Sequence, residues 1–304
     1  MKKGIYAGIV KKMSDLNLDE IVFSQGENYE HYILKNDYRH NVHSISKFVT
    51  SLCVGIAINL GFFKDGLDEP ILKYFLDIRI DNKRNFEFIK SAKLRHLLTL
   101  TLGHGQRLLD SSEIEELGNK NMAEYVLNYP ILYEAGTHFV YSSAPFYLLS
   151  MMISKSTGLS LLDFAQENLF SKLDISDIDW LKSEEGFSLG CTGLEIKAED
   201  LHKLGKLMLN DGIYKGFNIV PREWINSMRN VHVLSPRYFD KKRALPKYGY
   251  GLGLWICENG IYFCDGTDGQ YIIIIPNQEM VITTVGNQKE MPIITDRMRE
   301  ILLN

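Results

Sequence analysis

The sequence predicts an α+β fold: one antiparallel sheet, flanked by helices from both ends of the chain, with an all-helical domain inserted between its two parts. Strand-like runs concentrate near the two ends of the sequence, whereas the middle has the apolar periodicity of helices. Strands from both ends can bury their apolar faces by sharing one sheet. We therefore expect a discontinuous sheet domain, residues 1–63 and 176–304, and a helical domain, residues 64–175.

The expected strands are short apolar runs bounded by turn residues. The segment Gly26-Glu27-Asn28 is a turn signal between the first two, and Asp-Gly pairs separate later ones. The expected strands cover residues 21–24, 32–34, 248–257, 261–264, 271–276 and 280–285.

The expected helices have apolar residues at helical spacing, and loops containing glycine separate several of them. They cover residues 4–14, 45–61, 71–76, 94–102, 114–127, 146–156, 161–169, 198–209, 221–228 and 296–303. An inserted domain leaves a cleft at its joint with the sheet, and ligand sites favour such joints. We expect loops at residues 103–106 and 236–247 to form walls of that cleft.

Composition excludes several classes of protein. The chain has 304 residues, 45% of them hydrophobic and 24% charged, as in a soluble globular protein. With 34 Lys and Arg against 38 Asp and Glu, the net charge of −4 gives no basic footprint for nucleic acid or an anionic membrane. No signal peptide or membrane-length apolar run is recognisable, and the four cysteines lack metal-ligand spacing. These observations predict a reduced, cytoplasmic location and no metal site.

The segment that begins at Ser44 is the first candidate for chemistry. The helix predicted after it has an apolar face and an opposite face of small or apolar residues, which is typical of a buried helix. Lys47 is the only Lys, Arg, Asp or Glu between Ser44 and Phe63. Residues three apart share a side of a helix, so a hydroxyl would stand beside a partly desolvated amine. Burial lowers the pKa of a lysine, and a neutral lysine can make a nearby serine nucleophilic.

A plainer interpretation of these two residues is also open. The Ser44 hydroxyl could accept from a backbone amide as an N-cap, and Lys47 could extend its amine to water. The pattern S-x-x-K is short and occurs by chance in many chains. Because this helix has no other charge, the catalytic interpretation is about as well supported as the plainer one.

Tyr141 is the second candidate, because it directly precedes a predicted helix. The positive potential of a helix N-terminus favours the phenolate, and a cationic lysine nearby would favour it further. Such a tyrosine could transfer protons at neutral pH. Alternatively, Tyr141 is an ordinary half-buried aromatic, and Ser142 or Ser143 caps the helix.

The third candidate is the segment at residues 262–270. It contains two Asp-Gly pairs between strands, which are strong turn signals, so a plain hairpin is one interpretation. The glycines also allow a backbone amide to approach a substrate and donate to an oxyanion.

Together these segments resemble the serine β-lactamase and penicillin-binding-protein superfamily, and more specifically its class C-related esterase and amide-hydrolase branch. Ser44-Ile45-Ser46-Lys47 matches the family's S-x-x-K motif, Tyr141-Ser142-Ser143 falls on Y-x-N, and Cys264-Asp265-Gly266 falls on the K-T-G box. The resemblance covers roughly residues 30–287 and implies the two-domain β-lactamase/transpeptidase-like fold.

The resemblance also implies a role for each of these residues. Ser44 would be the nucleophile that carries the acyl group, and Lys47 and Tyr141 would share the general base and acid roles as a coupled pair. The backbone amides of Ser44 and Thr267 would form the oxyanion hole. The substrate-binding positions would be Ser143, Cys264, Asp265 and Gly266. No metal or organic cofactor is implied.

Two departures from the family pattern favour an esterase or amidase over a true β-lactamase. Ser143 replaces the usual Asn, and the third motif lacks the cation that holds the carboxylate of penicillins. Asp265 would add negative charge if it points inward, so we expect weak β-lactamase activity and a preference for neutral or cationic substrates.

The sequence therefore predicts a serine hydrolase that acts on a small ester or amide through a Ser44 acyl-enzyme. The main alternative is a catalytically impaired family member that serves as a ligand-binding or sensing module. A weaker alternative is acyl transfer to an acceptor other than water. The sequence leaves the oligomeric state open.

Overall fold

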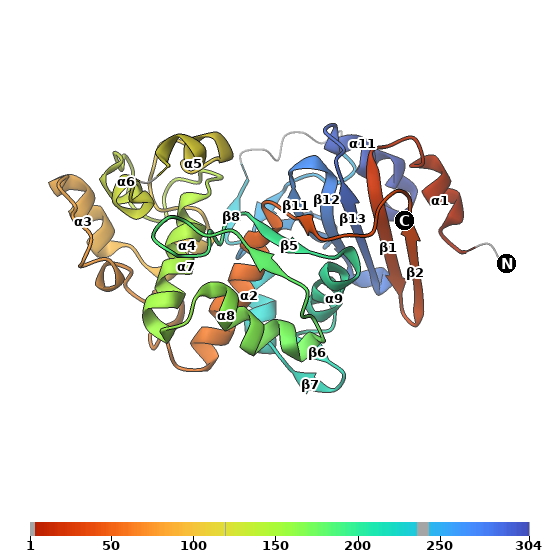
Figure 1. Cartoon of the computed structure of the whole chain (residues 1–304), viewed down its shortest axis with the longest axis horizontal. Coiled ribbons are helices and arrows are strands. Elements are labelled where there is room, and N and C mark those ends of the chain that lie inside the picture. Colours follow the sequence, from red (N-terminus) through yellow and green to blue (C-terminus); the bar gives the residue numbers. More distant parts are fainter. Residues whose placement is uncertain (1–3, 119, 236–242, 304) are drawn as a thin grey trace.

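A central antiparallel sheet joins the two ends of the chain. The computed structural model describes residues 4–118, 120–235 and 243–303. Within these residues the largest sheet has eight strands in the order β2-β1-β13-β12-β11-β10-β9-β8 (Figure 1). The strands of this sheet are β1 (Leu18–Gln25), β2 (Asn28–Ile33), β8 (Val233–Leu234), β9 (Gly249–Tyr250), β10 (Trp255–Ile256), β11 (Tyr262–Gly266), β12 (Gln270–Ile275) and β13 (Met280–Gly286).

The N-terminal hairpin completes a sheet that is otherwise built from C-terminal strands. The turn Gly26-Glu27 connects β1 to β2, and β1 then pairs with β13, with Ile21 opposite Thr284. β1 and β13 are buried almost throughout, so the strands from one end of the chain would not be stable in water without those from the other end. The predicted α+β fold, with strands from both ends in one antiparallel sheet, is confirmed.

Helices cover both faces of this sheet. Phe23 of β1 stacks on Tyr6, next to α1, whereas the neighbouring Ser24 hydrogen-bonds His202 of α9. Adjacent residues of a strand point to opposite faces, so α1 and α9 lie on opposite sides (Figure 1). The helices of this half are α1 (Ala7–Lys12), α9 (Ala198–Leu209), α10 (Arg222–Met228), α11 (Met291–Arg297) and α12 (Arg299–Leu302).

A group of helices lies at the other end of the molecule, with α2 between it and the sheet (Figure 1). α2 (Ile45–Asn59) contacts α7 and α8 on one side and β11 and β12 on the other, and its residues 45–57 are all buried. The helices of this group are α3 (Lys83–Ser91), α4 (Leu94–Leu98), α5 (Ser111–Leu117), α6 (Met122–Asn128), α7 (Ala144–Thr157) and α8 (Leu161–Ala165). The division into two domains at residues 63/64 and 175/176 stays a prediction.

Several elements differ from the sequence-based expectation. The run at 248–257 is not one strand but the hairpin of β9 and β10, because the chain reverses at Gly251–Leu254, where Gly253 has a φ of +86°. The expected helix at 114–127 is split into α5 and α6, and the one at 296–303 begins earlier, at α11. The expected helix at 71–76 is only a 3₁₀ turn, Leu72–Tyr74, and α8 continues as a π-helical turn, Gln166–Phe170.

Several features were not expected from the sequence. One is α3, and another is a small sheet of β3 (His40–Asn41), β5 (Leu194–Ile196) and β4 (Asp179–Trp180). A further two-stranded sheet pairs β6 (Ile213–Tyr214) with β7 (Phe217–Asn218). The small sheet matters for function, because β3 leads directly into Ser44.

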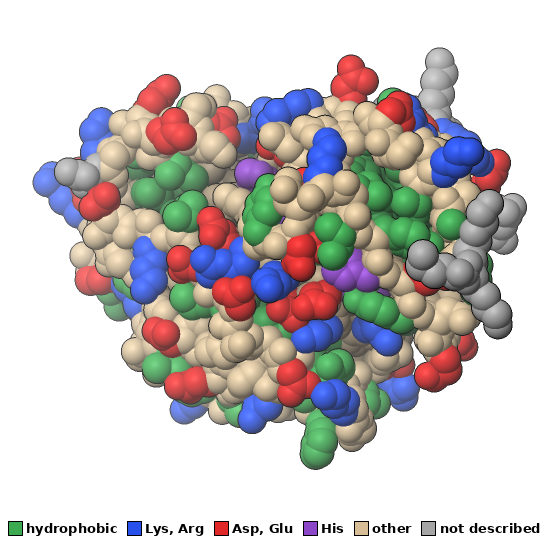
Figure 2. Space-filling view, turned by 45° about the vertical axis from the view of Figure 1, so that its right-hand side comes forward, with side chains coloured by type: hydrophobic (Ala, Val, Ile, Leu, Met, Phe, Trp, Pro, Cys, Tyr) green, Lys and Arg blue, Asp and Glu red, His purple; other side chains and the backbone are tan. Residues whose placement is uncertain are grey.

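The outer surface mixes charges of both signs. On the face drawn in Figure 2, Lys and Arg side chains alternate with Asp and Glu and form no large patch of one sign. Within the described ranges, no helix combines the length and apolarity needed to cross a bilayer.

His202 should make the stability of the fold depend on pH. Its ring nitrogens contact Thr283 Oγ1 at 3.0 Å and Ser24 Oγ at 2.8 Å, and burial lowers its pKa from 6.5 to about 3. Between these values the unfolded chain binds a proton that the folded protein does not. The free energy of unfolding should therefore fall as the pH drops through this window, by about 1.4 kcal/mol per pH unit.

Urea denaturation at pH 7 and pH 5 tests this linkage. The His202→Gln variant should lose about 1–3 kcal/mol at pH 7, because two buried hydroxyls lose their partner, and its stability should depend less on pH. His104, whose pKa burial lowers to about 4, will leave some slope. The exposed His232→Gln is the control. If the free energy of unfolding of His202→Gln depends on pH as steeply as that of the wild type, His202 is not the source of the pH dependence.

Candidate active site

The site is built at the N-terminus of α2. Ser44 precedes the helix, and its side chain makes no capping hydrogen bond, so the alternative in which its hydroxyl caps the helix is wrong. His43 has a φ of +47°, in the left-handed region, and its backbone N–H donates to Asn41 Oδ1 at 2.9 Å. A non-glycine residue in this conformation stores strain, as is common at functional sites. This turn presents Ser44 at the end of a buried helix.

Lys47 points back toward Ser44 and does not reach water. It is 1% exposed, so the alternative of an extended, solvated amine is wrong. Its Nζ lies 3.2 Å from Ser44 Oγ, 3.5 Å from Ser143 Oγ and 3.0 Å from the carbonyl oxygen of Cys191. Burial lowers the pKa of Lys47. The arrangement favours a neutral amine that can accept the Ser44 proton.

Tyr141 lies over the same amine. Lys47 Nζ is 5.3 Å from the centre of the Tyr141 ring, and the ring stacks on Trp255 at 5.2 Å and meets the edge of Tyr250 at 6.0 Å. Neither of the neighbouring serines caps α7 with its side chain. Ser142 instead exchanges hydrogen bonds with the backbone of Leu108, and Ser143 makes no capping bond.

A cleft of about 180 Å³ opens onto these groups. Its lining brings together Ser44, Tyr141, Ser143 and Thr267, four of the residues that the sequence singled out. The other lining residues are His43, Arg107, Leu108, Leu109, Asp110, Ser111, Ser142 and Thr192. Lys47 lies behind this lining, within hydrogen-bond distance of Ser44.

Two backbone amides in the cleft are available as donors. Among the described residues, the N–H groups of Ser44 and Thr267 make no hydrogen bond to another protein group. Ser44 is at a helix N-terminus, where backbone partial charges favour an anion. Both N–H groups are therefore available to donate to an anionic oxygen in the cleft.

The third sequence motif contributes less than expected to the cleft surface. The lining excludes Cys264, Asp265 and Gly266. Cys264 is buried in β11, opposite Ile272, and burial raises its pKa well above the ordinary range. Gly266 lies so close to Val42 that an added Cβ would be 2.2 Å from the Val42 carbonyl oxygen. Gly266 thus supports the turn before Ser44.

Asp265 does not bring an unpaired negative charge to the site. Its carboxylate accepts from Lys247 Nζ at 2.7 Å and from Trp255 Nε1 at 2.9 Å. Lys247 also lies 4.2 Å from the centre of the Trp255 ring. Because Lys247 offsets the charge of this carboxylate, Asp265 gives no ground for expecting a preference for neutral or cationic substrates.

Sequence reasoning missed the segment that holds the Lys47 amine from behind. Three side chains of α2 and α7 donate to consecutive parts of this segment: Ser150 to the Ser188 carbonyl at 2.6 Å, Thr50 to Gly190 at 2.7 Å and Lys47 to Cys191 at 3.0 Å. Burial also raises the pKa of the Cys191 thiol.

The backbone conformation and the close packing at position 190 require a glycine. Its φ is +66°, and a Cβ there would lie 2.7 Å from the Phe146 carbonyl oxygen. The paired glycines in Gly190-Cys191-Thr192-Gly193 were the one available signal of a tightly placed backbone. Nothing local in the sequence connects them to Lys47, about 140 positions earlier.

The two loops expected as cleft walls have different outcomes. His104 of the first is buried, and its Nε2 contacts the Val126 carbonyl oxygen at 3.1 Å, so it is absent from the cleft lining. Arg107 to Asp110, just beyond that loop, form a wall instead. Residues 236–242 of the second loop lie outside the described residues.

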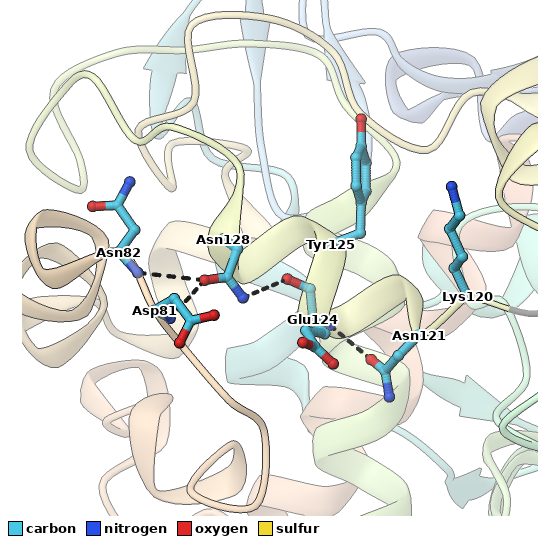
Figure 3. Close-up of a pocket in the computed structure, with 7 residues that line it drawn as sticks. All are labelled: Asp81, Asn82, Lys120, Asn121, Glu124, Tyr125 and Asn128. Atoms are coloured by element: carbon cyan, nitrogen blue, oxygen red, sulfur yellow. Dashed lines mark hydrogen bonds between the residues drawn. The ribbon is translucent and has the colours of Figure 1, made fainter.

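A larger recess in the helical region lacks the features of a reactive site. It measures about 820 Å³ and lies between α3 and α6 (Figure 3). Asn128 accepts from the backbone of Asp81 and donates to Glu124, while Asn121 caps α6 (Figure 3). These polar groups thus serve the local backbone. In the described parts of the chain, no three His, Cys, Asp or Glu side chains are grouped to hold a metal ion.

Comparison with known proteins assigns the chain by sequence and by fold. The family model described as Beta-lactamase matches residues 22–303. A 6-aminohexanoate-dimer hydrolase from Paenarthrobacter ureafaciens is 23% identical over 272 residues, covering 83% of this chain and 67% of that protein.

Solved structures with the same fold include an octameric penicillin-binding protein homologue from Pyrococcus abyssi. Its TM-score is 0.75 at 20% identity, with 98% of this chain and 76% of that chain covered. Another is EstCE1, described as a hydrolase with promiscuous acyltransferase activity, with a TM-score of 0.73, 16% identity, and 98% and 97% of the two chains covered. At these identities the likeness is one of fold.

Thr50 should act on the chemistry by positioning Lys47. Thr50→Val keeps the shape but removes the hydrogen bond to Gly190, which frees the segment whose Cys191 carbonyl accepts from Lys47. We expect kcat/KM for an ester to fall about tenfold, the effect of one lost hydrogen bond. The acid limb of the pH–rate profile should move to lower pH, because the ammonium form loses an acceptor.

Thr50→Ser is the matched control, since it keeps the hydroxyl and should restore both the rate and the profile. A Thr50→Val variant that is less stable but has an unchanged kcat/KM and pH profile would show that Thr50 serves the fold alone.

Proposed function

This chain belongs to the beta-lactamase family, and we propose that it is a class C-related serine hydrolase that cleaves esters or amides through an acyl-enzyme on Ser44. The observation that carries the proposal is the buried Lys47 amine, 3.2 Å from Ser44 Oγ at the floor of a cleft. The prediction of a hydrolase related to β-lactamases and penicillin-binding proteins is confirmed by the family match. The residue roles below are proposals.

In the first half-reaction, Ser44 Oγ attacks the substrate carbonyl carbon and its proton passes to Lys47. A neutral amine can accept that proton, and burial favours the neutral form. The carbonyl oxygen becomes an oxyanion and accepts from the N–H groups of Ser44 and Thr267. Removing one such donor typically costs about 100- to 1,000-fold in rate.

The tetrahedral intermediate then expels the leaving group. Lys47 and Tyr141 return the proton to the leaving oxygen or nitrogen, which leaves the acyl group on Ser44 as an ester. Water attacks this ester in the second half-reaction, Lys47 and Tyr141 take its proton, and Ser44 departs with a proton restored. Lys47 Nζ lies 5.3 Å from the centre of the Tyr141 ring, so the charge of each side chain influences the other and we treat their titrations as coupled.

The substrate is a small molecule that fits a cleft of about 180 Å³. The relative named for hydrolysis of a 6-aminohexanoate dimer supports a linear amide as one candidate substrate. Ser143 contacts Lys47 and lines the cleft, so we keep it as a substrate-binding residue. Cys264, Asp265 and Gly266 would act indirectly, by supporting Thr267 and the turn before Ser44. We propose a cytoplasmic location and two domains that meet at this cleft.

A fluorophosphonate probe tests the nucleophile directly. The probe should add once to the wild-type protein and not to Ser44→Ala, as measured by intact mass. Ser111→Ala, which removes an exposed serine of the same cleft, is the control and should still be labelled. Absence of an adduct on the wild type would instead support a ligand-binding module.

A further inference from the structure

Arg107 places a cation on the wall of the cleft. It lines the cleft together with Ser44 and Tyr141, and its side chain is exposed. Among the described residues, its guanidinium forms no ion pair with a carboxylate within 4.0 Å and no hydrogen bond. An unpaired guanidinium in a substrate cleft has its donors available for a ligand.

The loop that carries Arg107 is fixed to the reactive centre. The next residue, Leu108, donates to Ser142 Oγ at 3.0 Å and accepts from the same hydroxyl at 3.1 Å. Its carbonyl oxygen also accepts from the N–H groups of Ser143 and Ala144, at 3.1 Å and 3.2 Å. The backbone beside Arg107 is therefore attached to the segment that also carries Tyr141.

The acidic groups around the cleft are already committed to other partners. Asp110 caps α5 by accepting from the Glu113 N–H at 3.0 Å and also accepts from Ser112 Oγ. These hydrogen bonds, and to a lesser degree the charge of Arg107, lower the pKa of Asp110, but no ion pair within 4.0 Å joins it to Arg107. Asp265 is paired with Lys247, and Asp268 with Lys289 at 2.7 Å. His43, the remaining titratable residue of the lining besides Tyr141, has a pKa lowered by burial and is thus neutral at pH 7.

We propose that Arg107 binds a carboxylate of the substrate, so that the preferred substrates are esters or amides with a carboxylate a few atoms from the scissile carbonyl. This inference rests on the proposed hydrolase function and names the substrate class of the same site. A guanidinium can hold a carboxylate with two parallel hydrogen bonds. Arg107 would supply the cation that the motif at residues 264–266 lacks. A carboxylate site at Arg107 reverses the preference for neutral or cationic substrates that the sequence predicted.

Two matched pairs of substrates test the inference on both sides of the scissile bond. For the acyl side, mono-p-nitrophenyl glutarate is compared with its methyl ester; for the leaving-group side, 4-acetoxybenzoate is compared with methyl 4-acetoxybenzoate. In at least one pair, the wild-type enzyme should favour the anion in kcat/KM by about tenfold, the lower range for a hydrogen bond to a charged group. Arg107→Gln should remove this preference and change the neutral partner less than about twofold.

Two further variants separate recognition from net charge. Arg107→Lys should restore part of the preference, because a point charge lacks the planar fork. Arg79→Gln removes a positive charge from an arginine that pairs with Asp81 outside the cleft and should leave the preference intact. A wild-type enzyme with no preference for the anion, or an Arg107→Gln variant that keeps the preference or loses activity equally on both partners, overturns the inference.

Binding measurements keep the inference testable apart from turnover. The glutarate pair is titrated into Ser44→Ala and into Ser44→Ala/Arg107→Gln by calorimetry. If the anion binds Ser44→Ala more tightly than its methyl ester does, and the difference disappears in the double variant, the carboxylate site is supported. This holds even if the wild type hydrolyses none of the esters, because a lack of hydrolysis overturns only the proposed hydrolase function. Equal binding of both partners to Ser44→Ala overturns the carboxylate site.

Discussion

The burial of one lysine amine determines how the rest of the site is arranged. Lys47 sits on a helix with no other charge, and its amine is held by two serine hydroxyls and one backbone carbonyl. Burying an ammonium without a carboxylate partner is costly, so the neutral form is favoured. Among the described residues no carboxylate lies within 4.0 Å of this amine. The structure thus lacks the ion pair that would keep this amine protonated, as the proposed role of Lys47 as a base requires.

The fold supplies what this amine requires from distant parts of the chain. α2 is covered by α7 and α8 on one side and by the sheet on the other, which excludes water from Lys47. The segment around Cys191 provides the carbonyl acceptor, and β11 ends where Thr267 enters the cleft. Close backbone approaches, such as that of Gly266 to Val42, hold the turn before Ser44 against the sheet.

The parts of the site that could be predicted are those with a local pattern. Ser44 and Lys47 share a helix turn, so their spacing and the uncharged helix were enough to place them together. Tyr141 could be proposed from its position before a helix and from the resemblance. The sheet could be predicted because apolar runs at both ends of the chain need each other.

The parts that could not be predicted depend on contacts between distant residues. Asp265 was expected to add negative charge near the cleft, because no local pattern reveals that Lys247 pairs with it. The run at 248–257 reads as one strand, since the reversal at Gly253 occurs where the chain packs against α2, with a Cβ position 3.1 Å from the Lys47 carbonyl oxygen. α3 was missed because its nine residues are mostly polar, with few buried positions.

The titration of Lys47 itself tests the central claim most directly. Lysine side chains labelled with ¹³C can be followed by NMR as the pH rises, with Lys47→Arg identifying the resonance. The account predicts that Lys47 titrates below the ordinary value of 10.5 and apart from the surface lysines. A Lys47 resonance that titrates together with the surface lysines would mean that the amine is charged at neutral pH, and it would contradict its role as the base for Ser44.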